Sequence, residues 1–335
     1  MEFRRLGRSG LLVSDICMGT MTFGSSVDEA TSMRLMDKTH DAGVNFYDSA
    51  EMYAVPPRAE TYGKSEEILG KWLRGKPRDS VIVATKISGP NGGAFGGIVP
   101  HIRGGGASLD WHHFAAAAEG SLKRLGVDYI DLYQTHWPDR TVPMEAQLEA
   151  FERLIEAGKV RYAGVSNENA WGLTRLAALG QSSGLPSIVS VQNVYHLLKR
   201  DFDGDMAEVC SREEIGMMAF SPIATGVLTG KYSGGIFPEG SRLANYPQRF
   251  RDRYGHPRAL DAADRYAAIA HDAGIDPAAL AVAWVRGRPG VTSALPGATR
   301  PEHVDAILAG GEITLDPDVL AAIEKVHTEF KNPVV

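Results

Sequence analysis

Residues 44–48, Val44-Asn45-Phe46-Tyr47-Asp48, form a short apolar run that ends in a carboxylate, and the chain repeats this design. Short apolar runs bounded by polar residues are typical of buried parallel strands. Eight such runs occur at fairly even intervals, at residues 15–18, 44–47, 81–86, 129–134, 160–165, 188–191, 216–220 and 291–295.

Longer segments separate these runs, and their apolar residues lie three and four positions apart, which predicts amphipathic helices. The segments are residues 29–42, 65–73, 111–125, 144–157, 171–179, 206–212, 260–273 and 301–308. Strands that alternate with helices in this way indicate an α/β fold, a single (β/α)8 TIM barrel. Ser65, which two glutamates follow, is expected to cap the second helix.

Two parts of the chain lie outside the eight predicted strand–helix pairs. Residues 3–6 and 11–13 flank Gly7-Arg8-Ser9-Gly10 and are expected to form an N-terminal β-hairpin. Residues 276–286 and 317–330 are expected to be extra C-terminal helices. Because no linker or change of composition divides the chain, we expect residues 1–335 to form a single barrel domain.

The composition argues against several classes of protein. A chain of 335 residues with 44% hydrophobic residues can bury a large core. A net charge of −6 without a polybasic stretch argues against a nucleic-acid or anionic-membrane partner. We expect a cytoplasmic protein, since no run is long enough for a membrane span and the start lacks an apolar signal core. The two cysteines, Cys17 and Cys210, are expected to be buried and reduced. A homo-oligomer is compatible with the sequence, which leaves the oligomeric state open.

Four polar residues follow three of the predicted strands: Asp48, Tyr53, Lys86 and His136. Parallel α/β folds carry their chemistry where strands pass into loops, so these side chains are expected to meet. Lowering the pKa of a phenol from about 10 by about 3 units requires about 4 kcal/mol, which a buried ammonium can supply. The ammonium needs a carboxylate in turn, and an imidazole can orient a carbonyl oxygen. Singly, each residue is also explained as a cap, a packed ring or a loop side chain.

Two loops, residues 88–110 and 221–258, are longer than plain connections need to be. Both follow predicted strands, so in a barrel both lie at the catalytic end. They are interpreted either as surface loops or as lids that become ordered around a ligand, and the sequence leaves both interpretations open.

The four polar residues and their neighbours resemble the aldo-keto reductase superfamily over the whole chain. Residues 55–61 narrow the resemblance to the bacterial Tas-like branch, which is related to potassium-channel β-subunits. The matching segments are Gly19-Thr20-Met21-Thr22-Phe23-Gly24, Asn45-Phe46-Tyr47-Asp48-Ser49-Ala50-Glu51-Met52-Tyr53, Tyr62-Gly63-Lys64-Ser65-Glu66, Ala84-Thr85-Lys86 and Asp131-Leu132-Tyr133-Gln134-Thr135-His136-Trp137-Pro138.

This resemblance implies that NADPH binds in an extended pose at the C-terminal face of the barrel and that an aldehyde or ketone is reversibly reduced there. It implies that Tyr53 is the general acid, that Lys86 and Asp48 make its phenol more acidic, and that His136 orients the substrate. The presence of His136 favours reduction of a carbonyl over reduction of a conjugated C=C bond.

The resemblance also implies a set of cofactor contacts, in keeping with the absence of a G-x-G-x-x-G Rossmann motif. The residues expected to hold the carboxamide and the nicotinamide ring are Ser166, Asn167, Gln192 and Phe220. Those expected to hold the pyrophosphate are Ser221, Pro222, Ile223, Gly226, Lys231 and Arg242. Those expected to hold the adenosine 2′-phosphate, at a helix N-terminus, are Gly297, Thr299, Arg300 and His303.

The chain departs from the family pattern at the adenine site. Ile307 stands where the family usually has an asparagine that touches adenine, and Ala306 replaces the neighbouring acid or glutamine. Adenine recognition is therefore expected to be weaker or different, while a preference for NADP over NAD is still expected.

The substrate is not readable from the sequence, but an apolar pocket with an aromatic side is expected. Arg58 is interpreted either as attracting an anionic group or as bracing its own loop. The expected pocket residues are Met21, Phe23, Met52, Val55, Arg58, Phe95 and Trp137.

Two other functions are alternatives to a reductase. The first is a metal-dependent barrel hydrolase, which needs several converging histidines and carboxylates, whereas the chain has no H-x-H motif. The second is a cofactor-binding regulatory subunit with slow turnover, like the channel β-subunits, although we expect no long N-terminal extension that could block a pore.

Overall fold

The strands of the computed structural model form a parallel barrel. The structure describes residues 1–90, 100–245 and 248–334, and within these ranges eight parallel strands are hydrogen-bonded in chain order. Backbone bonds between Cys17 and Ala294 (2.8 Å) and between Gly19 and Pro296 (2.9 Å) join the first strand to the last. The strands are β3 (Met18–Gly19), β4 (Phe46–Asp48), β5 (Ile82–Ile87), β6 (Ile130–Thr135), β7 (Val160–Ser166), β8 (Ile188–Val194), β9 (Gly216–Phe220) and β10 (Val291–Leu295).

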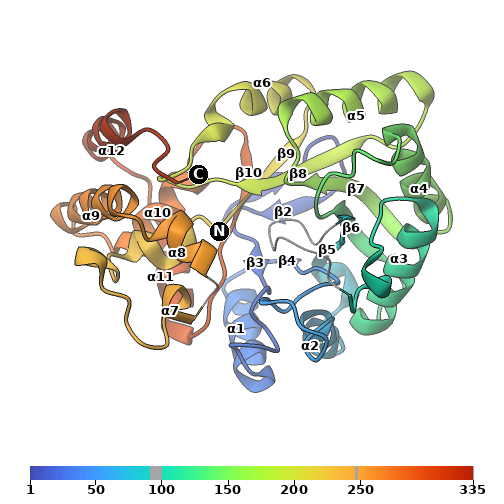
Figure 1. The fold of residues 1–335 in the computed structure, drawn as a ribbon, viewed down its shortest axis with the longest axis horizontal. Coiled ribbons are helices and arrows are strands. Elements are labelled where there is room, and N and C mark those ends of the chain that lie inside the picture. The colour runs from blue at the N-terminus through green and yellow to red at the C-terminus, as the bar shows by residue number, and fades with distance from the viewer. Residues whose placement is uncertain (91–99, 246–247, 335) are drawn as a thin grey trace.

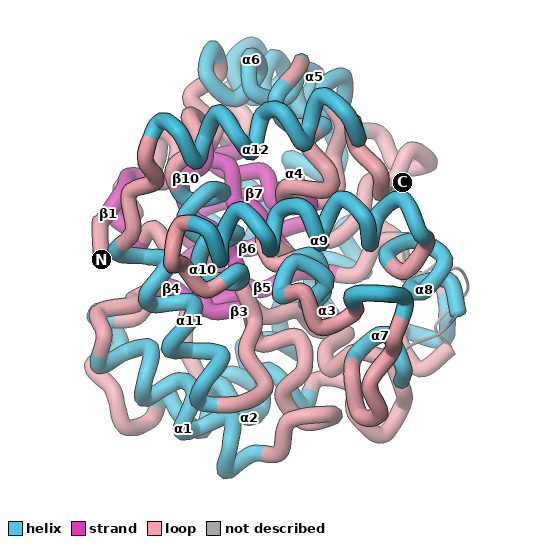
Figure 2. The backbone as a smooth tube through the Cα atoms, turned by 90° about the vertical axis from the view of Figure 1, so that its left-hand side faces the viewer, coloured by secondary structure: helices cyan, strands magenta, loops and turns pink. Residues whose placement is uncertain are grey.

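Helices surround the strands (Figure 1), which confirms the predicted (β/α)8 fold. The extra helices α10 (Pro277–Arg286) and α12 (Pro317–Phe330) are also where the sequence predicts them. Helix α12 lies beside α9 (Pro257–Asp272), as Figure 2 shows. The α-helices that alternate with the strands or follow them are α1 (Glu29–Asp41), α2 (Lys64–Leu73), α3 (Trp111–Leu125), α4 (Met144–Glu156), α5 (Ala170–Ser183), α6 (Asp205–Arg212), α9 (Pro257–Asp272), α10 (Pro277–Arg286), α11 (Pro301–Glu312) and α12 (Pro317–Phe330). Short 3-10 helices are η1 (Arg78–Ser80) and η4 (Asp201–Asp203). No helix in the described ranges is long and apolar enough to cross a membrane.

The predicted hairpin, β1 (Phe3–Arg5) and β2 (Leu12–Ser14), is antiparallel and covers one end of the barrel. Leu6, just after β1, and Val13, in β2, are fully buried and join the apolar cluster inside the barrel, with Phe46 and Leu132. This end of the barrel is therefore filled by side chains, which leaves the chemistry to the other end.

Local capping chemistry explains several helix ends. Asp110 accepts a hydrogen bond from the backbone of His113 at the start of α3, and Gly126 ends that helix with a φ of 64°. The prediction for Ser65 was wrong, because α2 begins one residue earlier and has Gly63 at its N-cap. The Ser65 hydroxyl bonds to Thr20 (2.6 Å) instead, inside the protein.

Both long loops contain short helices and follow the carboxyl end of a strand. The described part of residues 88–110 includes η3 (Arg103–Gly105). Residues 221–258 include η5 (Ala224–Thr229), η6 (Ser233–Gly235), α7 (Arg242–Asn245) and α8 (Gln248–Tyr254) before α9 begins. These four helices were not predicted from the sequence.

Candidate active site

Asp48 and Lys86 form a buried ion pair at the ends of β4 and β5. The Lys86 ammonium is fully buried and donates to Asp48 Oδ2 (2.5 Å) and to the Ser49 carbonyl (2.7 Å). Burial is the largest influence on the pKa of Lys86 and alone would lower it. The charges of Asp48 and Tyr53 and the hydrogen bond to Asp48 together outweigh burial, and the pKa is raised. Lys86 is therefore positively charged inside the barrel at neutral pH.

Tyr53 and His136 lie beside this charge. The Lys86 ammonium is 5.1 Å from the centre of the Tyr53 ring, and the Tyr53 ring meets the His136 ring edge-on at 5.5 Å. Burial, and then the charge of Lys86, hold the pKa of His136 well below its usual value, so the imidazole is neutral. Trp137 stacks on His136 at 3.8 Å and fixes the plane of that ring. The structure thus gathers the four residues that the sequence singled out.

Two glutamines complete the surroundings of Asp48. Gln134 on β6 and Gln192 on β8 each donate to Asp48 Oδ1, at 3.1 and 2.8 Å. Gln192 was expected to contact the cofactor, whereas Gln134 was not predicted as a site residue. The available signal was a polar side chain within the apolar run before His136.

A second buried carboxylate, Glu51, fastens the two loops that flank Tyr53. It accepts hydrogen bonds from the Ser88 amide (2.6 Å), from both terminal nitrogens of Arg103 (2.6 and 2.9 Å) and from the Tyr62 hydroxyl (3.2 Å). The segment around Arg103 is thereby tied to the segment that carries Tyr53. Arg103 was not predicted as a site residue.

Apolar side chains cluster around Tyr53 on the side where a substrate is expected. Met52, Val55 and Ile102 are buried there, and both long loops contribute, since Phe250 of α8 packs against the same cluster. Among the predicted pocket residues, Met21 and Trp137 also contact this cluster. Two other predicted residues lie elsewhere, since Phe23 is buried in the main core and Arg58 is on an exposed turn. The predicted residue Phe95 is outside the described residues.

The residues expected at the nicotinamide end are linked to one another. The Ser166 hydroxyl (2.7 Å) and the Asn167 backbone N–H (3.0 Å) both donate to the backbone carbonyl of Gln192, and the Asn167 side chain donates to the backbone carbonyl of His136 (2.9 Å). Phe220 is half-buried at the end of β9, opposite Val194. Amide and hydroxyl groups beside an aromatic ring fit a nicotinamide carboxamide and its ring.

The predicted pyrophosphate loop is a chain of tight turns. Ser221 and Thr225 have φ values of 58° and 60°, and Gly226 has 88°. Lys231 folds back over this turn, where a side chain on Gly226 would meet its ammonium at 2.7 Å. Pro222 and Ile223 lead from β9 into the same turn.

Three predicted phosphate contacts lie within electrostatic reach of His303. Burial lowers the pKa of His303, the positive charges of Lys231, Arg300 and Arg242 lower it further, and the negative charge of Glu302 opposes them. His303 accepts the Thr299 amide (3.4 Å) at the start of α11, just after Gly297 and Ala298. Cations at a helix N-terminus fit a phosphate group.

The position at which the sequence departs from the family pattern is part of the core. Ile307 is fully buried and packs in the main core, and Ala306 beside it is half-buried. The position therefore serves packing in this chain.

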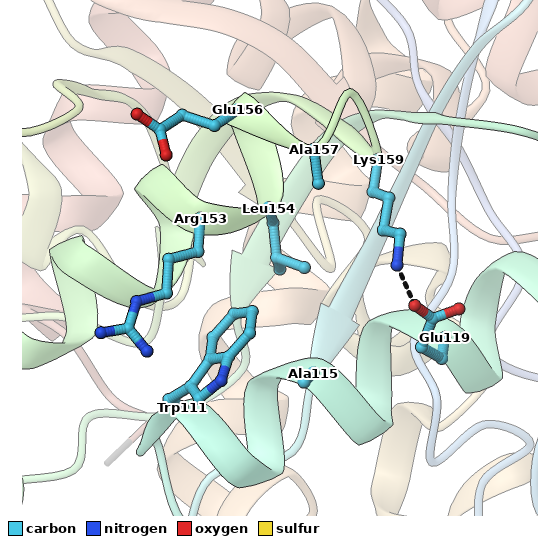
Figure 3. Close-up of a pocket in the computed structure, with 8 residues that line it drawn as sticks. All are labelled: Trp111, Ala115, Glu119, Arg153, Leu154, Glu156, Ala157 and Lys159. Carbon is cyan, nitrogen blue, oxygen red and sulfur yellow. Dashed lines mark hydrogen bonds and ion pairs between the residues drawn. The ribbon is translucent and has the colours of Figure 1, made fainter.

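A hollow of about 530 Å³ lies outside the barrel between α3 and α4 and shares no lining residue with the site above (Figure 3). Arg153 lies over the Trp111 ring at 5.1 Å, and Lys159 pairs with Glu119. Within the described ranges, no group of three His, Cys, Asp or Glu side chains could hold a metal ion.

Comparison with known proteins agrees with this geometry. The model of the aldo/keto reductase family matches residues 15–328. Protein tas of Escherichia coli is 40% identical, over 99% of both chains. The uncharacterized oxidoreductase YrpG of Bacillus subtilis and a probable voltage-gated potassium channel subunit beta of Oryza sativa are each 34% identical, over 97% of this chain and 96% of theirs. The predicted resemblance to the Tas-like branch is thereby confirmed, and the chain belongs to the aldo/keto reductase family.

Proposed function

We propose that this oxidoreductase uses NADPH to reduce an aldehyde or ketone to the alcohol, reversibly. The observation that carries the proposal is the buried Lys86 ammonium between the Asp48 carboxylate and the Tyr53 ring, with neutral His136 at the edge of that ring. The apolar cluster around Tyr53 supports a small apolar or aromatic carbonyl compound as the substrate.

Each catalytic side chain has a distinct task in this proposal. The positive charge of Lys86 favours the phenolate of Tyr53, which makes the phenol a better proton donor to the carbonyl oxygen. Asp48 keeps Lys86 charged, and neutral His136 can donate a hydrogen bond that orients the same oxygen. The apolar walls exclude water from the proton transfer.

NADPH, when bound, supplies the hydride for the carbonyl carbon. Ser166, Asn167 and Gln192 would hold its carboxamide, Phe220 its ring, and the turn around Gly226 with Lys231 its pyrophosphate. Arg300, whose charge acts on His303 at the start of α11, supports a bound 2′-phosphate and therefore a preference for NADP over NAD.

Replacing Tyr53 with phenylalanine tests the assignment of the acid. Tyr53→Phe should lower kcat/KM for 4-nitrobenzaldehyde by about 10²- to 10⁴-fold, while NADPH binding, measured by fluorescence, stays within about twofold. Activity within about tenfold of the wild-type value would remove Tyr53 from the mechanism.

Arg300→Ala tests the 2′-phosphate contact. Because the guanidinium would face a group that NADH lacks, the Kd of NADPH should rise about tenfold and that of NADH should not change. An equal effect on both cofactors would show that Arg300 does not recognise the phosphate.

A regulatory subunit with slow turnover is a second candidate, because relatives from rice, Arabidopsis thaliana and Schizosaccharomyces pombe are named as probable or putative potassium channel β-subunits. Tight NADPH binding without turnover on a panel of carbonyl compounds would favour it over the reductase.

A further inference from the structure

Gln134 lies at the centre of a hydrogen-bonded chain inside the barrel. Its side chain is fully buried, and its Nε2 donates to Asp48 Oδ1 at 3.1 Å. Gln192 donates from its own Nε2 to the same Asp48 oxygen (2.8 Å) and to Gln134 Oε1 (3.3 Å). The chain thus links a residue expected at the cofactor to the carboxylate that holds Lys86.

The chemistry of these groups fixes the direction of every bond. A carboxylate can only accept hydrogen bonds, so both glutamines must turn their NH₂ groups toward Asp48. Gln134 then offers its Oε1 to the second N–H of Gln192. Both side-chain N–H groups of Gln192 are used inside the barrel, so its side-chain oxygen Oε1 is the atom that remains for a donor on a ligand.

The strand between the two glutamines is built to let them meet. Gln134 pairs with Gly164 on β7, which pairs with Ser190 on β8. A Cβ at Gly164 would lie 2.4 Å from the Ser190 hydroxyl and 3.1 Å from Gln134 Cγ. Glycine at this position therefore provides the space through which the Gln134 side chain crosses β7.

We propose that Gln134 is a positioning residue, which disperses the charge of Asp48 and holds Gln192 with its carbonyl oxygen toward the cofactor. This role rests on the proposed function. Without the Gln134 donor, the Asp48 charge acts more strongly on Lys86, and Lys86 then supports the Tyr53 phenolate less. Gln134 would in this way couple the cofactor contact at Gln192 to the acidity of Tyr53.

Gln134→Met tests the role, because methionine has similar length and removes both hydrogen bonds. We expect kcat for 4-nitrobenzaldehyde to fall about tenfold at neutral pH. We also expect the alkaline limb of the kcat profile to move to higher pH, by about half a unit or more, while KM for the aldehyde stays within about twofold. Unchanged kcat and an unchanged alkaline limb would overturn the proposal, even if the melting temperature falls.

Gln134→Glu separates the two roles of the side chain, donating to Asp48 and accepting from Gln192. It also replaces the methionine variant as the test if that variant does not fold. The introduced carboxyl keeps an oxygen for Gln192 but can donate to Asp48 only while protonated. A carboxyl beside a second carboxylate holds its proton to higher pH. Activity should therefore approach the wild-type value in acid and fall as pH rises, and a constant ratio to the wild type across pH would contradict the role.

Gln147→Met is the matched control. Gln147 is also buried, and its Nε2 donates to the Asp139 and Val142 carbonyls (both 2.9 Å) at the start of α4. It should lower the melting temperature without moving the alkaline limb. A limb that moves equally in both glutamine variants would show that Gln134 is only structural.

Failure of the proposed function can be told apart from failure of this inference. If the wild-type protein does not turn over any carbonyl compound, the proposed reductase function is refuted, independently of the role of Gln134. In that case the phenol of Tyr53 is titrated by ultraviolet absorbance, as the difference between wild type and Tyr53→Phe. Gln134→Met, measured against its own Tyr53→Phe double variant, should shift that titration to higher pH, and no shift would overturn the inference alone.

Discussion

Lys86 carries its charge with no exposed surface, and the Asp48 carboxylate and the Ser49 carbonyl are what hold it there. A buried ion pair contributes little net stability, because the desolvation of two charges offsets their attraction. Removing one partner is different, since the other is left as an uncompensated charge. The pair therefore contributes to the proposed mechanism through its effect on Tyr53, and each charge of the pair needs the other to stay buried.

Single replacements of this pair should cost more than the double replacement. We expect Asp48→Asn and Lys86→Met each to lower the free energy of unfolding by about 3–5 kcal/mol. The double variant should recover part of that loss, because no unpaired charge remains. Urea unfolding of all four proteins measures the coupling, and single losses below about 1 kcal/mol would contradict the description of the pair as buried and interdependent.

At the scale of elements, the Glu51 carboxylate determines how one long loop lies against the site. Ile102 and Ala107 flank Arg103 and contact the apolar cluster around Tyr53. The bidentate bond between Arg103 and Glu51 therefore fixes a wall of the expected pocket. The groups that would hold NADPH lie on other strand ends and do not depend on this bond.

Arg103→Met should loosen that wall and leave Glu51 short of two donors. We expect KM for 4-nitrobenzaldehyde to rise about tenfold, with the Kd of NADPH unchanged. Arg212→Met, which breaks the exposed pair with Glu208 on α6, is the control and should change neither value. A rise in both constants for Arg103→Met would indicate general disorder at the catalytic end.

The elements themselves were largely predictable, because each has its own periodicity. Residues 111–125 and 317–330 were predicted with the observed bounds, and so were residues 216–220 and 291–295. The first strand was not, since Met18–Gly19 is shorter than predicted and Ile16 forms a separate bridge to Ala294. Its place depends on the last strand, which no local pattern reveals.

Only the site residues that belong to recognisable sequence motifs could be predicted. Asp48, Tyr53, Lys86 and His136 stand at strand ends, so their meeting follows from the fold. Gln134, Glu51 and Phe250 depend on contacts across the barrel or between loops, such as the bond of Gln134 to Asp48. Those contacts join positions far apart in the chain, and the residue types alone do not indicate them.

At the scale of the whole molecule, a buried histidine lies where the C-terminal segment is fastened. His196 has no exposed surface, and burial, and then the charges of Arg253 and Lys199, lower its pKa to about 3. Nearby, the Val334 amide donates to the Leu198 carbonyl (3.3 Å), so the end of the described chain packs over this region. The folded protein cannot accept a proton at His196 in mild acid, whereas the unfolded chain can.

Stability should therefore fall as pH falls below the ordinary histidine value of 6.5. Each histidine that stays neutral only in the folded state removes about 1.4 kcal/mol per pH unit from the free energy of unfolding. His196→Gln should make this decline shallower by about that amount between pH 6 and pH 4, as measured by urea unfolding. His112→Gln, at an exposed position, is the control, and an unchanged slope for His196→Gln would contradict the assigned burial.

The hydrogen bonds from Cys17 to Ala294 and from Gly19 to Pro296 close the barrel between the first and last strands of the sheet. During synthesis on the ribosome, the strand near Cys17 emerges early and its closing partner emerges last. At about 5–20 residues per second, the gap is on the order of tens of seconds. For that time the nascent sheet keeps an open edge, which can pair with other chains. A translation product cut short before Ala294 would keep that edge permanently, and we expect such fragments to aggregate or to be degraded.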